Sequence, residues 1–177
     1  MSVKPETTFW KNLKTLLDDG EYIVSRLESY VTPGFPDCLV YHKDTGFFTI
    51  ELKLAQHNNK IILSPFQIAW NMRHAMIGAQ SYILVKLPDK EEVKLFHGCK
   101  TKDLGHMTLD QVPGLYEGRL ADLDLAKLLN SQTPNSETPV NVAFCHRAED
   151  PGAGRPARDP INSKLRWRKT AINYHAS

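Results

Sequence analysis

The chain has 177 residues, of which 41% are hydrophobic and 24% charged, and its formal net charge at pH 7 is +2. These proportions are typical of a soluble globular domain, and no stretch reaches the roughly 20 apolar residues that a membrane span needs. The N-terminus has no signal-peptide pattern, and three scattered cysteines are too few for a disulfide scaffold or a four-ligand zinc site. We therefore expect a cytoplasmic protein with no membrane partner.

Hydrophobic periodicity predicts alternating helices and strands along the first 130 residues. The turn at 43–46 predicts a hairpin between two of these strands. Ser64-Pro65-Phe66-Gln67 predicts a helix start, with Ser64 as the cap and Gln67 completing a capping box. We expect helices over 6–17, from 65 to near Gly78 and over 119–130, and strands over 22–27, 38–41, 47–54, 81–87 and 93–96. The apolar face of the second helix would comprise Ile68, Met72, Ala75, Met76 and Ala79.

The composition changes after Ser131, since five of the eleven prolines fall in the last 47 residues. This composition predicts a largely disordered tail over 131–177. Residues 146–177 carry seven basic and three acidic side chains, whereas the rest of the chain has a net charge of −2. A basic tail beside a near-neutral body is common in nucleic-acid-binding proteins, and it is also compatible with a tail that is merely solvated.

An acidic pair and a lysine belong to the predicted hairpin. Because strand side chains alternate, Glu51 and Lys53 share one face of their strand, with Cβ atoms about 6–7 Å apart. Charges in an otherwise apolar strand are costly unless they are paired, hydrated or bound to a ligand. The hairpin also brings Asp37, at the start of one strand, beside the end of its partner strand, where Glu51 and Lys53 stand.

Two carboxylates held together repel each other, and a divalent cation is the usual reason for such a pair. Oxygen ligands favour Mg²⁺ or Mn²⁺ over zinc, and such an ion can polarise a phosphodiester. Lys53 would add positive charge beside the attacking water. Taken singly, these residues could be a turn aspartate and a solvated strand face. Their combination with the strand–turn–strand–helix order favours phosphodiester hydrolysis.

Three strings resemble the PD-(D/E)XK nuclease superfamily: Gly34-Phe35-Pro36-Asp37, Phe48-Thr49-Ile50-Glu51-Leu52-Lys53 and Ser64-Pro65-Phe66-Gln67-Ile68-Ala69-Trp70. The resemblance covers about residues 20–97. It is greatest to the branch of virus-type replication–repair (VRR) nuclease domains and Holliday-junction-resolvase-like phage nucleases. It implies a restriction-endonuclease-like α/β fold over 1–130, with a mixed central sheet flanked by helices. It also implies Mg²⁺-dependent cleavage of DNA that leaves a 5′ phosphate and a 3′ hydroxyl.

The resemblance further implies individual roles. Asp37 and Glu51 would bind Mg²⁺ (or Mn²⁺) with help from the Leu52 carbonyl, and Lys53 would serve the water or the scissile phosphate. Gln67 matches a glutamine near the active site in this branch, and its place in a capping box does not exclude that role.

Other candidates are an additional acid and a set of basic residues. Glu28 stands where several members of the branch carry a further metal-binding acid, although a surface glutamate is the ordinary alternative. Arg26 could contact phosphate or pair with Glu28. The expected DNA-binding residues are Arg26, Lys60, Arg73, Lys164, Arg166, Arg168 and Lys169.

A second class of function stays open at this point, namely a catalytically inactive nucleic-acid-binding or assembly module that retains the nuclease fold. The sequence also leaves open the shape of the DNA substrate, endonuclease or exonuclease action, and sequence preference. Resolution of a four-way junction would imply a homodimer. Trp10 and Trp70 are expected to be packing residues of helices rather than platforms for bases.

Overall fold

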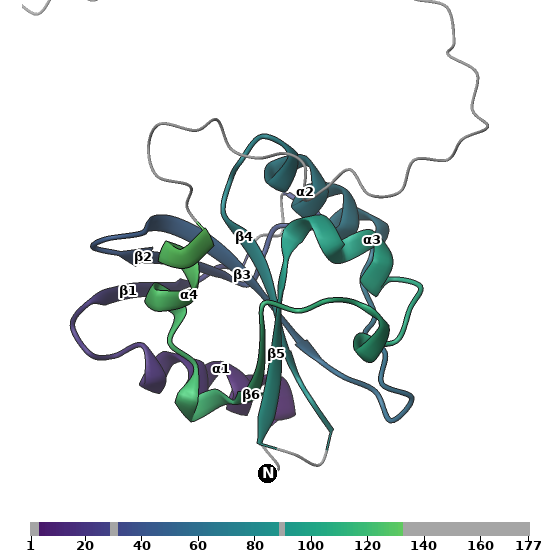
Figure 1. The fold of residues 1–177 in the computed structure, drawn as a ribbon, viewed down its shortest axis with the longest axis horizontal. Helices are drawn as coiled ribbons and strands as arrows, with labels where there is room; N and C mark the ends of the chain where they lie inside the picture. The colour runs from purple at the N-terminus through teal and green to yellow at the C-terminus, as the bar shows by residue number, and fades with distance from the viewer. Residues whose placement is uncertain (1–3, 29–31, 89–90, 133–177) are drawn as a thin grey trace, which may run out of the picture. The chain divides into compact units, whose positions relative to one another are not determined.

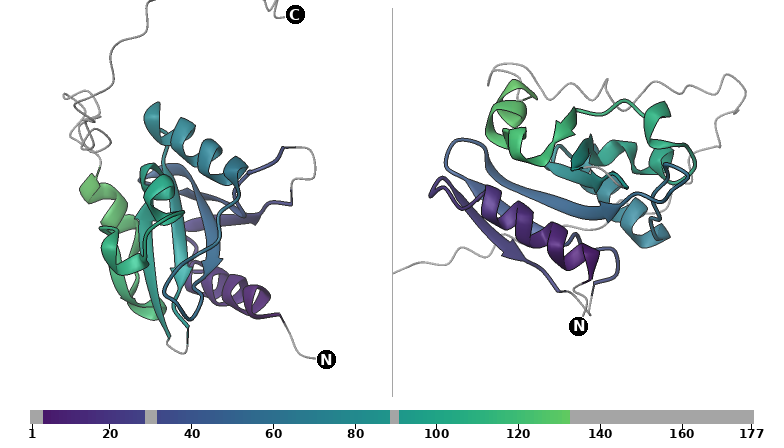
Figure 2. Two further views of the ribbon diagram at one scale, coloured as in Figure 1. Left: turned by 90° about the vertical axis from the view of Figure 1, so that its right-hand side faces the viewer. Right: turned by 90° about the horizontal axis from the view of Figure 1, so that it is seen from below.

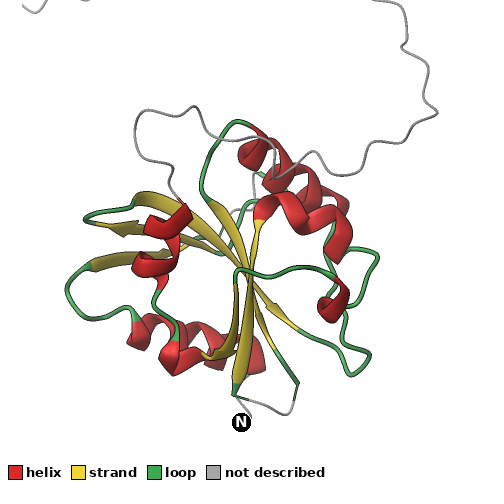
Figure 3. Cartoon of the chain, viewed as in Figure 1, coloured by secondary structure: helices red, strands yellow, loops and turns green. Residues whose placement is uncertain are grey.

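The computed structural model describes residues 4–28, 32–88 and 91–132 (Figure 1). These residues form a mixed six-stranded sheet flanked by helices, which confirms the predicted α/β architecture (Figure 3). The strands are β1 (Tyr22–Arg26), β2 (Cys38–His42), β3 (Gly46–Leu54), β4 (Ser81–Lys86), β5 (Glu92–His97) and β6 (Tyr116–Arg119). The helices are α1 (Pro5–Leu16), α2 (Pro65–Met76), α3 (Thr101–Leu104) and α4 (Leu125–Gln132), and the 3-10 turns are η1 (Gly98–Lys100), η2 (Leu109–Gln111) and η3 (Leu120–Asp122).

The strands lie in the sheet in chain order, β1-β2-β3-β4-β5-β6. All neighbours are antiparallel except β3 and β4, which run parallel. Parallel neighbours need a crossover connection, and α2 belongs to the one between β3 and β4. The C-terminal ends of these two strands therefore lie together, with Lys53 paired to Val85.

Two apolar clusters form the core because alternate residues of a strand point to opposite faces of the sheet. In β4, Leu84 belongs to the cluster that contains Phe9 of α1 and Leu129 of α4. Its neighbour Ile83 belongs to the second cluster, which contains Leu104 of α3. Two further views show α1 and α2 well apart along the sheet (Figure 2). The two clusters show that α1 and α4 cover one face of the sheet and that α3 covers the other.

The second predicted helix is correct at its start and partly wrong in its apolar face. α2 begins at Pro65 and ends at Met76, and Gly78 follows with a positive φ of 83°. Met76 is 61% exposed, and Ala79 lies beyond the helix. The residues of α2 that are buried include Asn71, which is polar. Periodicity cannot predict this arrangement, because a buried asparagine is stabilised by its hydrogen bonds and not by apolar transfer.

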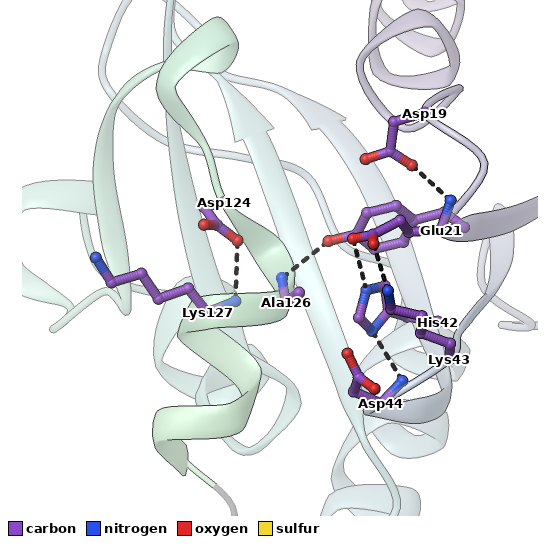
Figure 4. A network of polar contacts seen from close by, with 9 residues as sticks. Asp19, Glu21, His42, Lys43, Asp44, Asp124, Ala126 and Lys127 are labelled. Carbon is purple, nitrogen blue, oxygen red and sulfur yellow. Dashed lines mark hydrogen bonds and ion pairs between the residues drawn. The ribbon is translucent and has the colours of Figure 1, made fainter.

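The predicted helix over 119–130 is also only partly correct, because β6 and η3 occupy the chain before α4 begins. Asp124 accepts the Lys127 N–H at 2.9 Å (Figure 4). The Tyr22 hydroxyl of β1 accepts the Ala126 N–H at 2.9 Å. Both contacts satisfy N–H groups that the first turn of a helix leaves free, so the start of α4 is fixed by capping and by β1.

The described part of the chain ends with α4, at residue 132. The predicted tail therefore lies almost entirely outside the described residues, and its first two residues, Ser131 and Gln132, belong to α4. Among the described residues, no helix has the length and apolar character required to cross a membrane.

Candidate active site

The hairpin of β2 and β3 brings Asp37 to the middle of the sheet. Cys38, the first residue of β2, pairs with Ile50 of β3 in antiparallel register. Asp37 precedes this pair, and its Oδ2 accepts the Leu52 N–H at 2.8 Å. The negative charge of Asp37 raises the pKa of Glu51, which lies between Ile50 and Leu52 in β3. The structure thus places the two predicted acids beside each other.

A close backbone contact holds the turn that precedes Asp37. Gly34 has a φ of +82°, a conformation that side chains other than glycine rarely adopt. A Cβ atom at Gly34 would lie 2.3 Å from the Phe66 carbonyl oxygen, in the first turn of α2. Only glycine fits this space. The turn that precedes Asp37 and the start of α2 therefore meet directly.

Glu51 is buried, with 1% of its surface exposed. Its Oε1 accepts hydrogen bonds from the Lys53 ammonium, at 3.0 Å, and from the Gln67 side-chain amide. Its Oε2 is buried and has no hydrogen-bond partner among the described residues. A buried carboxylate oxygen without a partner is rare in native proteins and is commonly explained by a bound ion or water.

The electrostatics of the pair favour a cation. Burial, reinforced by the charge of Asp37, raises the pKa of Glu51 to about 7, against the opposing effect of Lys53 and Gln67. Burial also raises the pKa of Asp37, although the Leu52 N–H and the charges of Lys53 and Arg26 oppose the shift. Both carboxylates are thus destabilised as anions in the metal-free protein. A divalent ion between them would remove that penalty.

Gln67 links the start of α2 to the acids. Its backbone N–H donates to the Ser64 hydroxyl at 3.2 Å, and its Oε1 accepts the Ser64 N–H at 3.0 Å, which completes the predicted capping box. Because the Ser64 N–H can only donate, the amide oxygen must face Ser64 and the amide nitrogen is left for Glu51. The cap thereby orients the Gln67 side chain toward the carboxylate.

Lys53 completes the cluster. Its side chain is 20% exposed, and Nζ lies 3.0 Å from Glu51 Oε1 and donates to Gln67 Oε1 at 3.2 Å. An ammonium has three N–H groups, so one of them remains for a ligand. The structure therefore brings together all four side chains predicted as catalytic.

The Leu52 backbone supplies a further oxygen. The N–H and C=O groups of a strand residue point to the same side of the strand. Since the Leu52 N–H meets the Asp37 carboxylate, the Leu52 carbonyl opens toward the same side. The predicted donor set of Asp37, Glu51 and the Leu52 carbonyl consists of oxygen alone and is thus suited to a hard divalent cation.

Glu28 and Arg26 lie at the end of β1 next to this site. Glu28 is exposed, and the Leu27 N–H before it donates to the Asp37 carbonyl at 2.7 Å. The described residues contain no group of three or more His, Cys, Asp or Glu side chains that could hold a metal ion, so Glu28 is not gathered with the two acids. The Arg26 guanidinium lies over the Trp10 ring, 5.9 Å from its centroid. Its positive charge acts to lower the pKa of Asp37.

The other predicted DNA-binding residues are more distant or lie outside the described chain. The Lys60 ammonium donates to the His106 carbonyl at 3.2 Å. Arg73 is exposed on α2, six residues after Gln67 and so about 9 Å further along the helix axis. The structure brings neither side chain to the acids. Lys164, Arg166, Arg168 and Lys169 belong to the stretch after residue 132, which the structure does not describe.

Asn71 supports Gln67 and was not predicted from the sequence as a site residue. Asn71 is fully buried, and its Nδ2 donates to the Gln67 carbonyl at 2.9 Å. Its Oδ1 accepts the Ser81 hydroxyl, which ties α2 to β4. The available signal was a polar residue one helical turn after Gln67, on the same face of the helix. Asn71 therefore helps to fix the helix that carries Gln67.

No protein-family model matches the chain, and no curated protein matches it either. Among solved structures, the chain is similar to Hjc, a Holliday junction resolvase from the archaeal hyperthermophile Archaeoglobus fulgidus. The two are 20% identical, with a TM-score of 0.48, and the match covers 70% of this chain and 98% of that one. The chemistry of the site rests on the side chains described above.

Proposed function

We propose that the chain is a metal-dependent nuclease that hydrolyses phosphodiester bonds in DNA. The observation that carries the proposal is the buried Glu51 Oε2, which has no hydrogen-bond partner among the described residues and belongs to an acid beside Asp37. An all-oxygen set of Asp37, Glu51 and the Leu52 carbonyl fits Mg²⁺ or Mn²⁺. When bound, such an ion would polarise the scissile phosphate and lower the pKa of a water molecule.

Lys53 would act on the phosphate directly. Glu51 Oε1 and Gln67 Oε1 hold its ammonium, and the remaining N–H can donate to a phosphate oxygen or to the attacking water. In the hydrolysis, a bond forms between the water oxygen and phosphorus as the water gives up a proton to solvent, and the bond from phosphorus to O3′ breaks. O3′ takes up a proton and leaves as the 3′ hydroxyl, while the phosphate stays on the 5′ end. The negative charge that develops on the phosphate oxygens is stabilised by the Lys53 charge.

Gln67 and Arg26 would have supporting roles. Gln67 orients the Glu51 carboxylate by donating to Oε1, so that Oε2 stays available for a ligand. Arg26, which is exposed and held against Trp10, would bind a neighbouring phosphate of the same strand. Glu28 is not gathered with the two acids in the metal-free protein, and it remains a proposed additional ligand of the bound ion. Lys60, Arg73 and the basic residues beyond 132 remain proposed DNA contacts.

The resemblance of the motif strings to resolvase-like nucleases supports a more specific proposal. We infer endonuclease action on structured or branched DNA during phage or bacterial replication, repair or recombination, in the cytoplasm. Residues 1–130 would form the nuclease domain, and residues 131–177 a basic tail that follows DNA. Cleavage of both strands at a four-way junction would require two protomers, and hence a homodimer.

The test compares the wild type with Lys53→Ala on plasmid, linear duplex, flap and four-way-junction DNA, with Mg²⁺ and with EDTA. We expect products only with Mg²⁺, and a loss of at least about 100-fold in rate for the variant. Lys102→Ala, which replaces an exposed lysine of α3, is the matched control and should retain the wild-type rate. DNA binding without cleavage by the wild type would instead support an inactive binding module, and equal rates for the wild type and Lys53→Ala would reject the proposed mechanism.

A further inference from the structure

Two phenylalanine rings are exposed beside the candidate acids. Phe35 is 38% exposed and stands two residues before Asp37, and Phe66 is 61% exposed and stands one residue before Gln67. A single exposed apolar side chain is ordinary on a protein surface. Two exposed aromatic side chains on the two segments that carry Asp37 and Gln67 mark a candidate binding surface.

The two rings belong to segments that touch each other. A Cβ atom on Gly34 would lie 2.3 Å from the Phe66 carbonyl oxygen, so the turn that carries Phe35 rests on the first turn of α2. The Phe35 ring meets the Trp70 ring edge to face, at 5.5 Å between centroids. Trp70 follows Phe66 by one helical turn and stacks on His74 at 3.6 Å. We call the exposed rings of Phe35 and Phe66, on these two touching segments, the aromatic platform, and Trp70 packs against the Phe35 ring.

The position of this platform next to Asp37 and Gln67 in the chain limits which molecules can bind to it. Phe35 and Phe66 are one or two residues from Asp37 and Gln67, so a protein docked on the rings would cover the acids and exclude the substrate. DNA whose scissile phosphate lies at the acids brings its own nucleobases to the platform. In a paired duplex those bases are stacked and enclosed, whereas an unpaired base is free to stack on an aromatic ring.

We propose that Phe35 and Phe66 stack an unpaired base of the DNA strand that Asp37 and Glu51 cleave. The inference rests on the proposed nuclease function and adds the feature of DNA that the site selects. Stacking on aromatic side chains tolerates any base, because every base has a π face. Selection would thus follow the presence of unpaired nucleotides and not their sequence.

The test measures binding in EDTA, which separates stacking from cleavage. Fluorescence anisotropy gives the Kd for a duplex and for the same duplex with a short single-stranded gap that contains 2-aminopurine. The variants are Phe66→Leu alone and Phe35→Leu with Phe66→Leu, which keep apolar side chains and remove the aromatic faces. Phe47→Leu is the matched control, because Phe47 is 67% exposed on β3 but lies six residues, or about 20 Å, from Lys53.

We expect the wild type and Phe47→Leu to prefer the gapped DNA and to quench the 2-aminopurine fluorescence. The preference should fall by roughly tenfold in the double variant, with less loss in Phe66→Leu, while the Kd for duplex stays the same because phosphate contacts determine it. A wild type without preference for the gap would overturn the inference, as would variants that keep the preference. A wild-type dimer that the double variant converts to monomer in sedimentation would also overturn it, by assigning the rings to a second copy.

The experiments distinguish a chain that is not a nuclease from a nuclease that does not stack an unpaired base. A wild-type protein that binds gapped DNA through the two rings but cleaves no DNA with Mg²⁺ would retain the base-stacking inference and reject the enzyme. Conversely, Mg²⁺-dependent cleavage with equal affinity for gap and duplex would retain the enzyme and reject the stacking. Thermal melts of each variant check that α2 and the turn remain folded.

Discussion

Gln67 donates its side-chain amide to the Glu51 carboxylate from the first turn of α2, while Ser64 holds the oxygen of the same amide at 3.0 Å. The capping box that starts the helix is thus also the device that directs the amide to the buried acid. Helix start and candidate site form one hydrogen-bonded unit, which also includes Lys53. Substitutions at Gln67 and Ser64 can therefore separate the helix cap from the hydrogen bond to Glu51.

Gln67→Glu should keep the cap and impair the site. A glutamate at this position still offers an oxygen to the Ser64 N–H, but it replaces the amide donor with a second negative charge facing Glu51. We expect the rate of DNA cleavage to fall at least tenfold, measured below the melting temperature of the variant. Ser64→Ala should show the reverse, with a stability loss of about 1 kcal/mol. Unchanged cleavage by Gln67→Glu would show that the amide donor is not needed.

Addition of Mg²⁺ or Mn²⁺ should raise the melting temperature of the wild type. Binding to the folded state alone stabilises a protein by about 2.7 kcal/mol when the free ion is at 100 times its Kd. Asp37→Asn and Glu51→Gln should lose this stabilisation, whereas Asp103→Asn, at an exposed position of α3, should keep it. An equal metal response in Glu51→Gln and the wild type would place the ion elsewhere.

The metal-free protein should lose stability as the pH rises. The pKa of Glu51 is about 7 in the folded protein, against an ordinary value of 4.5, so the folded state binds more protons between these values. Its contribution is therefore complete below pH 4.5 and is lost as the pH rises through 7, by roughly 3 kcal/mol. Urea unfolding in EDTA at several pH values measures it. The difference between the wild type and Glu51→Gln isolates this contribution, and two parallel profiles would contradict it.

Gly34→Ala should destabilise the protein more than Gly46→Ala does. Both glycines have a positive φ, so each substitution incurs a backbone penalty of about 1–2 kcal/mol. A Cβ atom at Gly46 has nothing within 4 Å, whereas at Gly34 it would overlap the Phe66 backbone. Chemical denaturation should therefore show an excess loss for Gly34→Ala, together with a lower cleavage rate because the turn also carries Asp37. Equal losses in the two variants would indicate that the turn relaxes freely.

Much of the candidate site could be predicted because its residues obey local rules. Alternation along β3 places Glu51 and Lys53 on the face opposite Ile50, and the Ser64 cap places Gln67 at the start of α2. Both rules depend on neighbours in the sequence. The prediction that Trp70 is a packing residue of its helix agrees with its stack on His74.

The parts that were missed depend on contacts between distant segments. The buried Asn71 side chain is stabilised by its hydrogen bond with Ser81, and the β3–β4 crossover brings the two residues together. The hydrogen bond from Lys60 to the His106 carbonyl, on a loop that follows α3, joins segments that are distant in the sequence. The late start of α4 depends on Tyr22, a residue of β1. No periodicity in the local sequence contains this information.

The strands lie in the sheet in the same order as in the sequence, so each strand pairs with the strand that was synthesised just before it. Such a sheet can grow by adding one edge at a time as the chain leaves the ribosome, because each new strand pairs with the one before it. The acids, the lysine and the glutamine all lie within residues 37–67, and β4 is the last strand that borders them. Their framework is therefore expected to assemble before β5, β6 and α4 have been translated.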